Sequence, residues 1–284
     1  MDFEKILSQN VIFKIIKVLV TGTSFLYLFN YLSDAYVRET INIKFGIQGL
    51  MFISLFVFSN ILLSIAWSKN IREIFGLNEV DSFLVSMRSY IGKYAAIKIG
   101  SYVIKYSQDF KLFDKKKFLK LAFFEQLVSL IVGLTFGIFY LFRDSENTFY
   151  PLILIFLINF LLFFGLKYSV SKKNNLFSKI VNSTSLYMLN SLYLFFIISE
   201  YIKTYNVNNY LLISAIYIFV SSLSMIFSII PAGLGVKEAG LIFLLTGIIQ
   251  EHEIINLLIE LRIFFIISDI FSYLLGVLEK LKKR

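Results

Sequence analysis

The sequence predicts an all-α, polytopic integral membrane protein, and its composition carries that prediction. Of the 284 residues, 57% are hydrophobic and only 17% are charged, and the mean hydropathy is +0.75. Soluble domains contain about 45–50% apolar and about 25% charged residues. A chain of this length cannot bury such an apolar excess in a water-soluble core, so lipid must surround most of it. A soluble enzyme, a disordered regulator and a secreted β-rich module are therefore excluded.

Six stretches are long and apolar enough to cross a bilayer as helices, which takes about 20 residues. They are predicted at about Ile15–Leu32, Gly46–Trp67, Phe118–Phe142, Tyr150–Lys167, Ile180–Ile202 and Ile254–Leu278. The first is expected to be a retained span, because no small-residue cleavage pattern accompanies it. We expect the whole chain, 1–284, to form a single transmembrane domain.

Two further apolar stretches are interrupted, and we predict that each forms a re-entrant hairpin. Residues 82–110 contain Gly92, Gly100 and four basic side chains, whereas residues 210–249 are too long for one span and are broken around Pro231. Irregular backbone at membrane depth must line a protein-enclosed or watery cavity, and a pair of interrupted segments is typical of inverted-repeat transporters. Ordinary kinked helices are the alternative, and two short crossings would also fit the second stretch.

Lysine and arginine orient these segments, because basic loops stay in the cytoplasm. The basic clusters are Lys5 with Lys14, Lys69 with Arg72, and the stretches 111–120, 167–179 and 280–284. Both termini are then cytoplasmic, in a cell membrane, and the two hairpins enter from opposite sides. These clusters also account for the net charge of +9, so no nucleic-acid partner is expected. With no cysteine and only His252, we expect no metal and no cofactor.

The most informative motif is PAGLGVKEAG at residues 231–240. Pro231 blocks helix continuation, and Gly233 and Gly235 allow a positive φ and close approach. A new helix is predicted to start near Val236, with Glu238 in its first turn. Free N–H groups at such a helix end can hold a phosphate or a carboxylate. A plain hairpin turn with a helix-start glutamate is the alternative.

This motif resembles the Pro-Gly-Gly-Leu-Gly-Val-x-Glu signature of the lysylphosphatidylglycerol synthase transmembrane-region family, also called flippase-like membrane proteins. The stretch RSYIGKYAAIKIG is similar to a second segment of that family, and the matching residues are Arg88, Gly92, Lys93, Tyr94 and Gly100. Glu125 fits a helix-borne glutamate of the family, and Arg262 fits an arginine in its last span. The resemblance covers most of the chain.

The resemblance implies a translocator for an anionic lipid, either a phospholipid or a polyprenyl-phosphate-linked sugar or glycan, in envelope lipid or polysaccharide biosynthesis. The residues expected to bind the lipid phosphate are Arg88, Lys93, Tyr94, Gly233, Gly235, Val236, Glu238 and Arg262. Those expected to gate the path or take up a proton are Glu125, Glu238 and Asp269. Gly92, Gly100 and Pro231 mark the breaks. Aminoacyl transfer is not expected, because no soluble synthase domain follows the membrane part.

Three alternatives stay open. Arg262 lies two helical turns from Asp269, so it could form a structural ion pair with Asp269 or with Glu238. The chain could be a membrane-embedded transferase, or its accessory subunit, in which Glu125, Glu238 and Asp269 act as acids and bases. It could also be a non-catalytic scaffold of a glycan-assembly complex. Beyond membrane lipids, the partners considered are a second copy of the chain and envelope-assembly proteins.

Overall fold

The described part of the chain is helical. The computed structural model describes residues 47–94, 101–102, 104–105, 115–138, 150–151, 153–155, 157–161, 176–205, 209–224 and 236–282. The predicted first span at Ile15–Leu32 lies outside these ranges, and so do Gly100, Pro231, Gly233 and Gly235. Within the ranges the backbone forms helices and the turns that join them.

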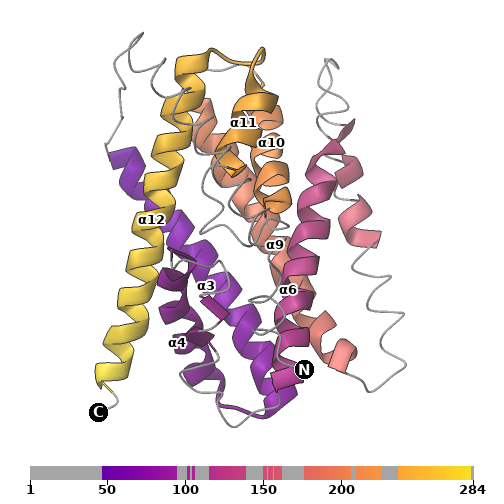
Figure 1. Cartoon of the computed structure of the whole chain (residues 1–284), viewed down its shortest axis with the longest axis vertical. Coiled ribbons are helices and arrows are strands. Elements are labelled where there is room, and N and C mark those ends of the chain that lie inside the picture. The colour runs from indigo at the N-terminus through magenta and orange to yellow at the C-terminus, as the bar shows by residue number, and fades with distance from the viewer. Residues whose placement is uncertain are drawn as a thin grey trace, which may run out of the picture.

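The elements follow one another along the chain as shown in Figure 1. They are α3 (Ile47–Phe75), α4 (Glu79–Ser89), the 3-10 helix η1 (Tyr90–Tyr94), α6 (Lys115–Phe136), α9 (Leu176–Lys203), α10 (Tyr210–Leu223), α11 (Val236–Leu245) and α12 (Glu251–Lys282). Among the described residues, three helices are long and apolar enough to cross a membrane, namely α3, α6 over Lys116–Phe136 and α9 over Ser185–Lys203. These three agree with predicted spans, and α12, at 32 residues, covers the predicted last span.

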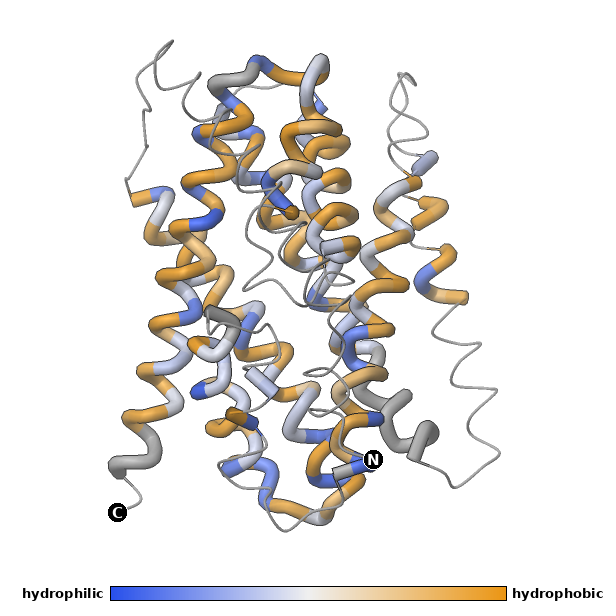
Figure 2. Tube along the Cα trace, viewed as in Figure 1, coloured by the Kyte–Doolittle hydropathy of each residue, from blue (hydrophilic) through white to orange (hydrophobic). Residues whose placement is uncertain are grey.

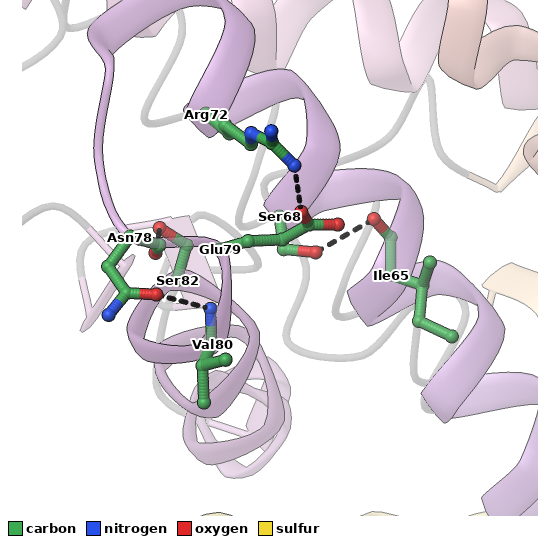
Figure 3. Close-up of polar contacts among 7 residues, drawn as sticks. All are labelled: Ile65, Ser68, Arg72, Asn78, Glu79, Val80 and Ser82. Atoms are coloured by element: carbon green, nitrogen blue, oxygen red, sulfur yellow. Dashed lines mark hydrogen bonds and ion pairs between the residues drawn. The ribbon is translucent and has the colours of Figure 1, made fainter.

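A tight turn joins α3 to α4, so that α4 packs back along α3 (Figure 3). Gly76 adopts a φ of 71° and donates its N–H to the carbonyl of Arg72, which ends α3 as a left-handed glycine cap. The Asn78 side chain then accepts the N–H of Val80 at 3.0 Å and caps α4. Arg72 and Glu79 form an ion pair of 2.7 Å across the turn.

The short helices lie at opposite ends of the molecule. Figure 1 shows α4 in the lower half, beside α3 and α12, and α10 with α11 in the upper half. The first interrupted stretch changes from α-helix to 3-10 helix at Tyr90, and α11 begins at Val236 as the motif predicted.

Glycines let two helix pairs approach closely. A Cβ on Gly276 of α12 would lie 3.0 Å from the carbonyl oxygen of Leu84 and 3.1 Å from the amide nitrogen of Arg88, both on α4. Gly133 of α6 faces Ser222 of α10 even more tightly. In both pairs a glycine of a long helix faces a short one.

Hydrophobic residues predominate along the helices of the bundle (Figure 2). Large side chains point outward on several helices, including Phe123 on α6 and Phe243 on α11, which are 71% and 76% exposed. Exposed apolar area of this extent marks a surface that contacts lipid or a partner. Together with the three long apolar helices, it is typical of a membrane protein.

Candidate functional site

The start of α11 brings an acidic and a basic side chain together. Glu238 lies in the first turn of α11, and its Oε1 is 3.3 Å from Nη1 of Arg262 on α12. The side chains are only 13% and 22% exposed. Arg262 is eleven residues after Glu251, the first residue of α12, which places it about 16 Å along that helix. That distance is about half the thickness of a bilayer's hydrocarbon core.

A second cation belongs to Lys237, the residue that precedes Glu238 in α11. Lys237 Nζ donates a hydrogen bond to the hydroxyl of Tyr217 on α10 at 2.6 Å. The same ammonium lies 3.9 Å from the ring centroid of Tyr217 and 5.4 Å from that of Phe265, and these two rings stack with an interplanar angle of 6°. Three helices thus converge on two cations and one carboxylate, an arrangement that favours an anionic ligand.

A separate buried cluster surrounds Glu125 on α6. Tyr102 donates its hydroxyl to Glu125 Oε2 at 3.0 Å, and Gln126 Nε2 donates to the oxygen of the same hydroxyl at 2.8 Å. Lys105 Nζ is 4.0 Å from Glu125 Oε1 and 3.9 Å from the ring centroid of Trp67. Glu125 and Lys105 are both buried, so their charges compensate each other inside the bundle.

Asp269 takes part in a third polar group, between α3 and α12. Asn60 Nδ2 donates to Asp269 Oδ1 at 2.9 Å and to Ser272 Oγ at 3.0 Å. Tyr90, the first residue of η1, donates its hydroxyl to the backbone carbonyl of Asn60 at 2.9 Å. The first interrupted segment is thereby tied to both long helices. Of the two ion pairs considered for Arg262, the structure contains the one with Glu238.

Arg88 lies at a different level from Arg262. It is buried at the end of α4, its Nε donates to the carbonyl of Leu84 at 3.2 Å, and its Cγ faces Gly276. Gly276 is fourteen residues beyond Arg262 on α12, a separation of about 21 Å along the helix. In this conformation the two arginines cannot hold one phosphate between them.

Of the neighbouring predicted residues, Gly92 is buried, and the backbone of Lys93 and Tyr94 forms the end of η1.

Sequence reasoning missed three ionisable residues, of which Lys105 and Glu260 are buried and Lys237 is partly buried. They are Lys105 beside Glu125, Lys237 beside Glu238, and Glu260, which is fully buried and accepts hydrogen bonds from Tyr201 and Tyr205. The signal was present, because each is an ionisable residue within an apolar stretch, where charges are costly and usually functional. Among the described residues, no group of three or more His, Cys, Asp or Glu side chains is placed to hold a metal.

No protein-family model, no curated protein and no solved structure matches this chain. The family resemblance of the PAGLGVKEAG motif therefore stays a prediction. The chemistry of the candidate site rests on the geometry around Glu238 and Arg262.

Proposed function

We propose that this protein is a flippase-like translocator that binds an anionic lipid and moves its headgroup across the cell membrane. The cargo is a phospholipid or a polyprenyl-phosphate-linked sugar or glycan, used in envelope lipid or polysaccharide biosynthesis. The observation that carries the proposal is the Glu238–Arg262 pair, at the first turn of α11 and about a third of the way along α12. A charge at such depth is expensive unless it serves a ligand or a partner.

The pair suggests how the lipid is held. A phosphate can replace the Glu238 carboxylate at Arg262, because a guanidinium binds either group through two parallel hydrogen bonds. The N–H groups at the start of α11 and the Lys237 ammonium add positive potential at the same place. Glu238 then acts as an internal competitor that occupies Arg262 when no lipid is present and accepts it back after release.

The arrangement of the short helices is compatible with the predicted topology of six crossings and two oppositely oriented re-entrant hairpins. We propose that the end of the molecule with the α3–α4 turn faces the cytoplasm, since Lys69, Arg72 and the start of α6 at Lys115–Lys117 gather there. On this view Arg88 provides a second contact for the phosphate, nearer the cytoplasm than Arg262. The headgroup would pass from one arginine to the other.

The test is to identify the lipid that the purified protein retains. Wild type and Arg262→Ala are released from nanodiscs into a native mass spectrometer, together with Arg72→Ala, a matched control whose arginine is 67% exposed in the α3–α4 turn. We expect wild type and the control to retain a specific phosphate-bearing lipid that Arg262→Ala loses.

Glu238→Gln sharpens this experiment. The amide cannot compete for Arg262 as an anion, so we expect this variant to retain at least as much of the lipid as wild type does. Equal amounts of bulk lipid in all four samples would overturn the proposal and favour a scaffold.

A further inference from the structure

A fully buried glutamate lies apart from the proposed phosphate site. Glu260 of α12 has no exposed surface, and its Oε2 accepts hydrogen bonds from the hydroxyls of Tyr201 on α9 and of Tyr205 just after that helix. It is nine residues after Glu251, about 14 Å along α12 from that end. A carboxyl group at this depth is costly to keep ionised.

In the part of the chain that the structure describes, aromatic rings pack around one of the tyrosines that bind Glu260. Tyr201 contacts Phe52 of α3 and Phe264 of α12 edge-on, with ring centroids 4.9 and 5.3 Å apart. The part of α3 that packs here, residues 47–68, contains no ionisable side chain. Among the described charged groups on α9, α11 and α12, Glu200 pairs with Lys203 near the surface, Arg262 pairs with Glu238, Lys237 binds Tyr217, and Glu253 lies near Tyr205.

The two tyrosines connect Glu260 to the end of the bundle. Tyr201 is buried, and its hydroxyl oxygen is 3.3 Å from that of Tyr205, which is half-buried just beyond the end of α9. Burial, aided by the Glu253 carboxylate, raises the pKa of Tyr205 to about 12. Tyr205 therefore keeps its proton at physiological pH, and its hydroxyl can pass protons along hydrogen bonds without becoming a phenolate.

We infer that Glu260 is a proton-binding site that is reached from the surface through Tyr205 and Tyr201. In the ionised state both phenols donate to the carboxylate. A proton entering at the Tyr205 end is handed along the hydroxyls to Glu260, which becomes a neutral acid, while each tyrosine regains the proton it passed on. The balance is one proton bound and one negative charge removed, with no other bond made or broken.

This site lies on the same helix as Arg262, which suggests what the proton is for. Neutralising Glu260 weakens its hydrogen bonds to α9, because bonds to a charged acceptor are about twice as strong as neutral ones. A shift of α12 would then change how Arg262 meets Glu238. This last step rests on the proposed lipid translocation, whereas the binding of a proton by Glu260 does not.

Infrared difference spectroscopy of the full chain during a pH titration tests the proton site directly, because a protonated carboxyl has a carbonyl band that a carboxylate lacks. We expect a titrating carboxyl band in wild type that is lost in Glu260→Gln and kept in Glu200→Gln, whose carboxylate is 64% exposed on α9. In Tyr205→Phe the midpoint of the carboxyl-band titration should move to higher pH, because the ionised Glu260 carboxylate has lost one hydrogen-bond donor.

Two outcomes would overturn the inference. One is a wild-type spectrum without a titrating band, which needs no variant to fold. The other is a band that persists unchanged in Glu260→Gln, which would assign it to another carboxyl group. Because the titration uses no lipid, its failure is distinguishable from a failure of lipid retention by Arg262.

Discussion

Tyr90 donates its hydroxyl to the backbone carbonyl of Asn60 at 2.9 Å, and this bond joins the first helix break to the middle of α3. The Asn60 side chain continues the connection to α12 through Asp269 and Ser272. One asparagine thus links the interrupted segment to both long helices that flank it. Four predictions follow from this and related contacts.

Replacing Asn60 by Ala should lower the free energy of unfolding by about 1–3 kcal/mol, because the buried Asp269 carboxylate loses a donor. Unfolding of the detergent-solubilised protein can be followed through Trp67, the single tryptophan of the chain. Ser54→Ala is the control, since Ser54 is exposed and bonds only within its own helix turn; it should change stability by less than about 0.5 kcal/mol. Equal effects of the two substitutions would contradict the hydrogen bond between Asn60 and Asp269.

A double-mutant cycle at Glu238 and Arg262 should show a coupling energy of about 0.5–3 kcal/mol in unfolding experiments, because the pair is largely shielded from solvent. The same cycle at Arg72 and Glu79 should give less than about 1 kcal/mol, because Arg72 is 67% exposed. A larger coupling for the exposed pair would indicate that Glu238 and Arg262 separate in the folded protein.

Gly276→Ala should destabilise the protein by about 1–3 kcal/mol or more, because the added methyl group meets the backbone of α4 at Leu84 and Arg88. Leu275→Ala, next to it on the outer face, removes atoms that are 45% exposed and serves as control. Thermal unfolding of both variants is the measurement. A neutral Gly276→Ala would show that α4 and α12 do not pack this closely.

Lys105→Met should destabilise the fold, because Glu125 would stay buried without the cation at 4.0 Å. Adding Glu125→Gln should recover part of the loss, since the remaining charge is then removed while Tyr102 keeps an acceptor. Lys116→Met, an exposed lysine at the start of α6, is the control for losing one positive charge. If the double variant is less stable than Lys105→Met, the pair does not account for the burial of Glu125.

The helical, apolar character of the chain and several element positions follow from the sequence alone. Hydropathy over about 20 residues predicted α3, α6 and α9, because burying apolar side chains in lipid requires nothing more than a long apolar helix. The start of α11 at Val236 was also predictable, since the Pro and Gly residues before it act on the local backbone. Those Pro and Gly residues themselves lie outside the described residues.

The partners of the charged side chains were decided by the tertiary structure. Helical spacing placed Arg262 and Asp269 on one face, yet Arg262 meets Glu238 and Asp269 accepts from Asn60. The packing of α4 against α12 likewise sets Arg88 and Arg262 at two levels, and the approach of α9 gives Glu260 its two tyrosines. Periodicity gives the face of one helix on which a residue lies. Which charge it meets depends on how two helices are placed, and long-range packing sets that placement.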